Sequence, residues 1–599
     1  MILPASQLPT ISTMLTPFSH YLQSNQAPTE DETREMKALK AGPLKEISII
    51  DVEIQKIEGI LNSLKQKRAH FQKSIDDFNT ILAPVRRLST DVLGVIFSHC
   101  LATHRNPVMS ASEAPILLTQ ICRDWRSIAL SIPRLWSRLY IPTLRRVLHY
   151  FPESSSCVLV GNRRMDALTQ EVQRWLKLSA ARPLAITLMP AGDPVYHPSL
   201  LDSIIESSRR WQELELGFLS PQSDVLTRLL SLTPDDLCML RELRIHSLCT
   251  TVNPHSQEVP EDLWYQSGLL TAQGLRSISI ADMHRTNAFP GGIPPNWKNL
   301  NHLFIHSPIS LGLAHPMLSY CCNLVACLFE IAGQWDDFEI HNPSITLPNT
   351  PITLSPCILP HLTFLSIQGD HAGCSQIFNS IEAPSLQILD YQGYFPSESE
   401  EFGLLNFLQN INSLETLRVD HHHLTESNIL KYSTLIPSVT HLVLGRSPRR
   451  NYRHYPYHNL HYTYPENVAV ITTLHEYRHQ YSPDSAPTLL FPSLEIFEAY
   501  DILGVTDIML LEFIKARIDA SKWNAGVSKL KKVLVDFSGT RQTDIVPEAL
   551  AYAQAAGIKL ELDLSYYTGK ELDATWSPSF GLSPDDVSWI YPLYDSNYY

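Results

Sequence analysis

The pattern in the sequence that could best support catalysis is His475-Glu476-Tyr477-Arg478-His479, which fits HExxH. In zinc peptidases with this pattern, a helix places both histidines on one face, and the glutamate polarises a zinc-bound water. Glu495 or Glu498, further along the chain, could supply a third zinc ligand. The chemistry to consider is therefore metal-assisted peptide hydrolysis.

The surroundings of this pattern argue against a zinc site. The stretch SPDSAP, residues 482–487, would end a helix soon after His479, and Glu495 and Glu498 belong to a predicted strand. A chain with 24 histidines can produce such a match by chance. The triple His421–His423 closes another predicted strand and is typical of a solvated edge. No glycine-rich phosphate loop or nucleophile elbow stands out. We expect no catalytic residues, no metal and no cofactor, with a zinc metalloprotease as an alternative.

Composition narrows the class of protein. At 599 residues the chain exceeds one compact core, and a hydrophobic content of 44% excludes wholesale disorder. A net charge of -14 argues against nucleic acid as the main partner, because phosphate backbones are bound with lysine and arginine. Ten cysteines without a CxxC pair indicate reduced thiols. The sequence shows neither a bilayer-spanning apolar run nor a signal-peptide pattern, so we expect no membrane association and a cytoplasmic or nuclear location.

The first part of the chain divides into a lead-in and a heptad helix. Residues 1–42 lack periodicity, and we expect them to be a disordered lead-in. Residues 43–83 show apolar residues at alternating steps of three and four, interrupted only by Arg68, and Pro84 would end this helix. The helix could pack back on its own domain or form a coiled-coil dimer, which Arg68 would weaken without preventing. Its apolar positions are Ile47, Ile50, Ile54, Ile57, Leu61, Leu64, Phe71, Ile75, Phe78 and Leu82.

Residues 84–142 are predicted to be all-α. A short helix that is apolar over most of its circumference comes first, with Asp91 in its first turn. Pro115 is well placed as the first residue of a second helix, which carries one continuous apolar stripe and ends at Pro133. So small a segment cannot hide its apolar surface alone, and some of it must meet a neighbour. The apolar residues concerned are Val92, Ile96, Phe97, Leu118, Ile121, Cys122, Trp125, Leu135 and Trp136.

This segment resembles an F-box, the module by which substrate receptors dock on the SKP-family adaptor of SCF cullin–RING ubiquitin ligases. LSTDVLGVIFSHCL (88–101) and CRDWRSIALSIPRLW (122–136) carry the resemblance. It covers residues 44–142 and is similar in particular to F-box proteins of mushroom-forming fungi. Ser89 stands where the family usually has proline, and a serine can cap the helix. The adaptor-binding residues that the resemblance implies are Leu88, Val92, Ile96, Phe97, Leu118, Ile121, Cys122, Trp125, Pro133, Leu135 and Trp136.

Residues 143–565 repeat a six-residue pattern: a large apolar residue, two others, a second apolar residue, a polar one and a third apolar residue. Several consecutive copies lie 24 to 28 residues apart, the period of leucine-rich repeats. Helical patterns lie between copies, so we expect strand plus helix in each repeat, stacked into a curved solenoid. Segments 182–188 and 210–216 would begin the array. The first positions of the copies are Leu240, Leu275, Leu300, Leu324, Leu362, Leu386, Leu414, Val439, Leu494 and Leu530.

Two surfaces of the array could bind a partner. The insertion 447–484 is rich in Tyr, His and Arg, which interfaces favour, although it could equally be disordered. The second surface is the concave face of the solenoid. Residues 566–599 form a polar and aromatic tail. The expected concave-face positions are His302, Phe304, His306, Thr363, Ser366, Gln368, Asp390, Gln392, Thr416, Arg418, Asp420 and His441.

The sequence therefore predicts an α/β protein in which a heptad helix and an all-α F-box precede a leucine-rich-repeat solenoid. We expect the chain to be the substrate-recognition adaptor of an SCF-type E3 ubiquitin ligase rather than an enzyme. The F-box would bind an SKP-family adaptor and, through it, a cullin, while the repeats would bind an unknown target protein. A leucine-rich-repeat scaffold without a link to a ligase is the alternative.

Overall fold

The computed structural model describes residues 17–103, 105–142, 155–189, 198–217, 224–245, 267–280, 293–332, 354–394, 403–419, 426–445, 489–502, 505–524, 526–537 and 539–566. The chain forms two units, residues 1–93 and 94–599. The first is helical, and the second is built around a large parallel sheet, so the mixed α/β class expected from the sequence is confirmed.

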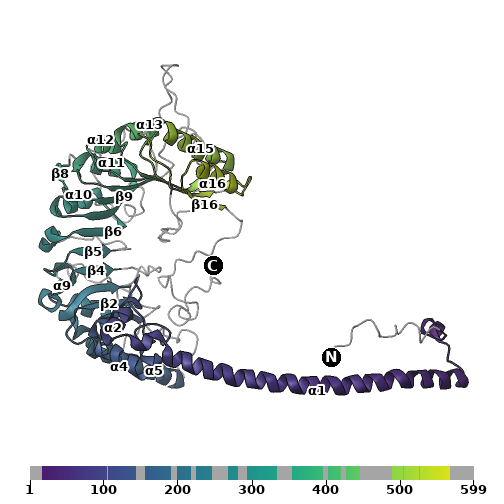
Figure 1. Cartoon of the computed structure of the whole chain (residues 1–599). Helices are drawn as coiled ribbons and strands as arrows, with labels where there is room; N and C mark the ends of the chain where they lie inside the picture. Colours follow the sequence, from purple (N-terminus) through teal and green to yellow (C-terminus); the bar gives the residue numbers. More distant parts are fainter. Residues whose placement is uncertain are drawn as a thin grey trace. The chain divides into compact units, whose positions relative to one another are not determined.

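The first unit contains the long helix α1 (Glu30–Leu82), drawn in purple in Figure 1. At about 1.5 Å per residue its 53 residues span roughly 80 Å. Thr29 and Glu32 form a reciprocal capping box, which is why the helix begins at Glu30 instead of following a lead-in that extends to residue 42. Pro43 lies inside the helix, and Pro84 follows its end. None of the residues of α1 is buried. Two 3₁₀ turns, η3 (Ser19–Gln23) and η4 (Pro84–Arg87), flank it.

The second unit is organised by a sheet of 14 parallel strands whose order follows the order of the chain. A separate pair of short strands, β8 (Cys357–Ile358) and β10 (Ile381–Glu382), is also parallel. The strands of the large sheet are β1 (Arg138–Pro142), β2 (Leu184–Met189), β3 (Trp211–Leu216), β4 (Glu242–Ile245), β5 (Ser277–Ile280), β6 (His302–Ile309), β7 (Ala326–Ile331), β9 (Phe364–Asp370), β11 (Ile388–Tyr394), β12 (Thr416–Val419), β13 (His441–Leu444), β14 (Ile496–Ile502), β15 (Lys532–Phe537) and β16 (Glu561–Tyr566).

The repeated apolar pattern explains where these strands begin. Each predicted first position from Leu240 to Leu530 is buried, and a strand starts two residues after it, as in Leu275 followed by β5. The second and third apolar residues of each copy form two buried rows across the sheet, because neighbouring strands pair in matching register; Ile278 lies beside Leu303, and Ile280 beside Ile305. The alternation of burial along the strands thus follows from the period of two.

Helices connect the strands and cover one side of the sheet, as Figure 1 shows for α10 to α13. Their buried residues supply the other half of the apolar interior, for example Phe378 of α11 against Phe407 of α12, with ring centroids 5.2 Å apart. Among the described residues, no helix is both long and apolar enough to cross a bilayer. The helices are α5 (Ser155–Leu178), α6 (Pro198–Ile205), α7 (Asp224–Leu230), α9 (Gly268–Thr271), α10 (Leu311–Tyr320), α11 (His371–Ser380), α12 (Gly403–Gln409), α13 (Glu426–Leu435), α15 (Asp507–Trp523) and α16 (Val546–Ala555), with 3₁₀ turns η7 (Ser208–Arg210), η8 (Pro234–Leu237) and η9 (Pro295–Asn299).

Candidate docking surface

The segment 84–142 contains three helices, a 3₁₀ turn and a strand. The helices are α2 (Thr90–His99), α3 (Leu118–Ile121) and α4 (Arg123–Ser131), followed by η5 (Pro133–Trp136) and then β1. Ser89 caps α2, since the backbone N–H of Val92 donates to its Oγ at 3.4 Å and that of Leu93 to its carbonyl at 3.0 Å. Ser89 therefore has a structural role at the start of α2.

The expected single helix from Pro115 to Pro133 is in fact two helices, and that prediction is wrong. Cys122 has an extended backbone (φ -157°, ψ 173°), which ends α3 at Ile121. Its sulfur accepts a hydrogen bond from the Trp125 N–H at 3.4 Å and so caps α4. Apolar steps of three and four residues occur in both short helices, so the sequence pattern does not reveal the break between them.

The interior of this segment is formed by Phe97, Leu118, Leu135 and Trp136, all of which are buried. The Phe97 ring packs on that of Trp125 with centroids 4.8 Å apart, which joins the end of α2 to α4. All four were among the residues predicted to bind an adaptor. The structure places them in the interior of the segment, beneath its surface.

Gly94 allows the close approach of α2 to the end of α4. A Cβ at this position would lie only 3.1 Å from Cδ1 of Ile132, which follows α4. A larger residue would therefore push the two helices apart.

Apolar side chains remain on the outside of the same helices. Val95 and Ile121 are the most exposed, at 59% and 56%. Trp125 and Pro133 are partly exposed, and Cys122 is exposed. Val95 lies in the predicted first helix, three residues from Val92, but neither Val95 nor Leu117 is among the adaptor-binding residues that the resemblance implies. The exposed large apolar residues are Leu88, Val92, Val95, Ile96, Leu117 and Ile121.

An ion pair shapes the loop between α2 and α3. The guanidinium of Arg105 donates to both carboxylate oxygens of Glu113 at 2.9 and 2.6 Å, and both side chains are largely buried. Beside this pair, Asn106 donates to Thr187 Oγ1 at 2.9 Å and accepts from Arg138 Nε at 2.8 Å. The loop that follows α2 is thereby tied to strands β1 and β2.

A second candidate surface is formed by partly exposed strand residues that alternate with the buried ones along each strand. Phe304 pairs in register with Leu328, and Phe364 pairs with Ile388, so these four partly exposed apolar residues occupy four neighbouring strands, β6, β7, β9 and β11. Of the positions expected on this face, Ser366 and Asp390 are buried, and Asp420 lies outside the described residues.

Charged residues occupy the next three strands of this surface. Arg418 lies on β12, His441 on β13 and Glu498 on β14. Nε2 of His441 lies 3.3 Å from Oε1 of Glu498, and Tyr500 donates to the other carboxylate oxygen at 2.8 Å. The neighbouring His441 is the main cause that holds the pKa of Glu498 below its usual value, and the bond from Tyr500 acts in the same direction. Nε of Arg418 is buried and has no hydrogen-bond partner among the described residues.

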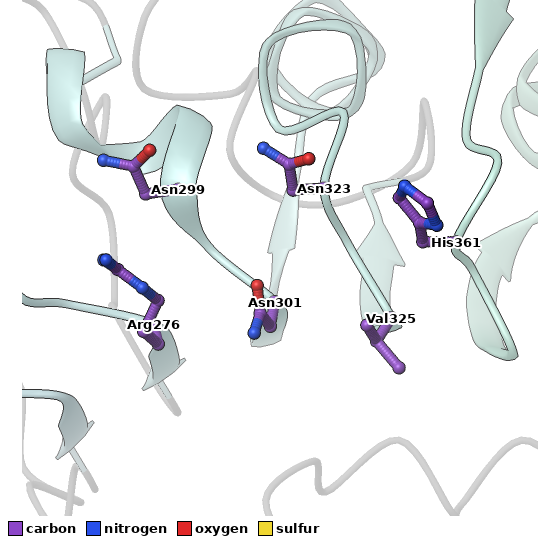
Figure 2. Close-up of a pocket in the computed structure, with 6 residues that line it drawn as sticks. All are labelled: Arg276, Asn299, Asn301, Asn323, Val325 and His361. Carbon is purple, nitrogen blue, oxygen red and sulfur yellow. The ribbon is translucent and has the colours of Figure 1, made fainter.

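A polar pocket of about 350 Å³ lies where strands β5 to β9 begin (Figure 2). Arg276 donates to the carbonyls of Gln273 and Leu275, and Asn323 donates to that of Lys298. Nη1 of Arg276 and the Asn323 amide are thus engaged by the chain itself. The lining residues are Arg276, Asn299, Asn301, Asn323, Val325 and His361.

The metal-binding pattern considered from the sequence is not assembled in the described part of the chain. His475–His479, His421–His423 and the whole insertion 447–484 lie outside the described residues. The two residues considered as a third zinc ligand have other partners. Glu495 accepts a hydrogen bond from Lys531, and Glu498 lies beside His441. Within the described ranges no group of three or more His, Cys, Asp or Glu side chains is arranged to hold a metal.

Comparison with known proteins identifies no relative of this chain. No family model matches the sequence, and a search of curated proteins gives no match either. The fold and the two candidate surfaces are therefore the basis on which a function can be argued.

Proposed function

We propose that residues 84–142 are an F-box-type module that docks on an SKP-family adaptor, and that the chain is a substrate receptor of an SCF-type ubiquitin ligase. The observation that carries this proposal is the division between buried and exposed apolar residues in the segment. Phe97, Leu135 and Trp136 already supply an interior, so Val95 and Ile121 are not needed for it and remain exposed to water. Exposed apolar residues grouped on short helices indicate a protein-binding surface.

We further propose that the sheet unit is a leucine-rich-repeat solenoid whose strand face holds the target protein. Strand order that follows chain order, with six of the thirteen intervals between strand starts at 24 to 28 residues, supports repeats that contact mainly their neighbours. The apolar cluster of Phe304, Leu328, Phe364 and Ile388 would supply buried contact area. The charged guanidinium of Arg418 on β12 would add polar specificity beside it.

In this function the chain acts by proximity. The adaptor and the cullin would hold a ubiquitin-charged enzyme, and the strand face would hold the target on the same assembly. Transfer to a target lysine then becomes effectively intramolecular, which raises the local concentration of the reacting groups. No catalytic residue of this chain is required for that effect.

Adaptor binding by the purified full chain tests the proposal. Ile121→Asp should weaken binding to an SKP-family adaptor at least tenfold, about 1.4 kcal/mol, because a charge would be buried at the centre of the interface. Ile508→Asp is the matched control, since Ile508 lies on α15 and is exposed to a similar extent, 54% against 56%. It should leave binding unchanged.

Two outcomes would contradict the proposal. One is equal binding by folded Ile121→Asp and Ile508→Asp. The other is failure of the unmodified chain to bind any SKP-family adaptor, which would favour a repeat scaffold with no link to a ligase. Calorimetry gives the affinities, and circular dichroism establishes that the variants are folded.

A further inference from the structure

The apolar face of α1 is uncovered along its whole length. The ten apolar heptad positions from Ile47 to Leu82 are between 47% and 64% exposed, and no residue of the helix is buried. Among the described residues of the first unit, none covers this face. Exposure of a stripe of this length to water is unfavourable, because its contiguous apolar area is far larger than that of isolated surface residues.

The spacing of the stripe fits one partner helix. The residues repeat every 3.5 positions on average, which keeps a narrow seam facing a single helix when two helices supercoil. Ile60 and Ile81 flank the seam and widen it on one side. The seam runs for five heptads, from Ile47 to Leu82, enough for a two-stranded coiled coil.

The charges beside the seam change sign near its centre. The first half is flanked by Glu46, Asp51, Glu53 and Glu58, and the second half by Lys65 and Lys67, with Arg68 in the seam itself. Within the described residues no ion pair involves any of these side chains. The helix therefore carries an acidic half and a basic half that are both available to a partner.

This distribution disfavours two parallel helices in register. In that arrangement each flanking residue of one helix lies beside the residue five positions further along in the other helix. Glu46 would then face Asp51, and Glu53 would face Glu58. Two Arg68 side chains would also meet in the seam. Like charges in these positions repel.

The reverse orientation removes those repulsions. With the helices antiparallel and Leu61 of one beside Leu64 of the other, Glu58 faces Lys65 twice by symmetry. Arg68 then lies beside Ile57 of the other helix, within the acidic half. We propose that α1 is a self-association element, which pairs antiparallel with α1 of a second copy of this chain through the seam centred on Leu61 and Leu64.

The mass of the full chain in solution is the first test. Analytical ultracentrifugation should give a dimer, twice 67.8 kDa. Leu61→Asp together with Leu64→Asp should give a monomer with an unchanged sheet unit, since both side chains are exposed in the single chain. A monomeric unmodified chain, or a trimer or larger assembly, would overturn the proposal.

Charge reversal tests the orientation. In the antiparallel dimer, Glu58→Lys places the new lysine against Lys65 of the other helix at two sites and should weaken dimerisation roughly tenfold. Adding Lys65→Glu to the same chain restores both pairs and should restore affinity. In a parallel dimer, Glu58→Lys should instead strengthen dimerisation, because it would replace the repulsion between Glu58 and Glu53 with an attraction. Tighter dimerisation by the single variant would therefore refute the antiparallel arrangement.

Discussion

The indole rings of Trp136 and Trp175 meet edge to face, with centroids 4.8 Å apart. Trp136 belongs to η5 and donates to the Ala129 carbonyl at 2.9 Å, while Trp175 belongs to α5 and donates to the Arg138 carbonyl at 3.1 Å. Both rings are buried. Residues 133–136 and the first helix over the sheet thus share one interior.

Replacing Trp136 should therefore change the stability of the fold more than it changes the exposed surface. Trp136→Ala removes a buried indole and leaves a cavity, which should cost about 3–5 kcal/mol in the free energy of unfolding. Trp523→Ala is the matched control, because Trp523 on α15 is 88% exposed and should cost less than about 0.5 kcal/mol. Urea unfolding measures both values. Equal effects of the two substitutions would show that the Trp136–Trp175 contact is not part of the core.

The pair His441–Glu498 should make stability depend on pH in the acidic range. The pKa of Glu498 is held below its usual value of 4.5, so its carboxylate stabilises the folded chain above that pH, and this stabilisation is lost as the pH falls through the depressed value. His441→Phe removes the main cause of the depression. The variant should be less stable than the unmodified chain at pH 6, and the difference should shrink towards pH 3.

Urea unfolding across that pH range measures this difference. Tyr500→Phe serves as the comparison, since it removes the weaker of the two contributions and should give a smaller difference of the same sign. A difference for His441→Phe that stays constant from pH 6 to pH 3 would show that packing, and not the carboxylate, accounts for the loss.

Replacing residues 447–484 by a short Gly/Ser linker should leave the sheet folded. The backbone on either side is anchored independently: Gly445 N–H donates to the Val419 carbonyl at 3.0 Å, and Phe491 N–H donates to Ser433 Oγ at 2.8 Å. The buried Arg517 donates to the carbonyls of Leu490 and Phe491 at 2.6 and 2.8 Å, which fixes the chain as it enters β14.

The same replacement should preserve adaptor binding and remove at least one cellular target, because Tyr and Arg are the residues that interfaces favour. Proteins that co-purify with each form from cells, identified by mass spectrometry, provide the measurement. An unchanged set of bound proteins would contradict a role for the insertion and leave the strand face as the target surface.

The sequence predicted the strands well wherever the repeat kept its first apolar residue. Two strands of the sheet were missed for different physical reasons. Before β1, Trp136 occupies the first position of the six-residue pattern, and Leu139 and Ile141 follow at the expected spacing. The sequence-based prediction places these residues in the all-α segment 84–142 instead. Before β16 the first position is Lys559, and the apolar contact comes from Ile558 and Leu560 on either side.

The docking residues were harder to predict because the helical pattern does not separate the inside from the outside of a small helical segment. Phe97 and Ile96 are adjacent in a run that is apolar nearly all round, yet one is buried and the other exposed. Phe97 faces the interior, where its ring contacts that of Trp125 on another helix, 28 positions along the chain. Local periodicity carries no information about those contacts.

The strand order of the sheet also has a consequence for how the chain acquires its structure. Each strand pairs with the one before it, apart from the short β8 and β10, so the contacts that close the sheet join residues near one another in sequence. Because each unit contacts mainly its neighbours, ordering can begin in one part of the sheet and spread to the next strand. During synthesis each new strand emerges next to an edge that is already complete, so ordering can advance along the chain as it leaves the ribosome.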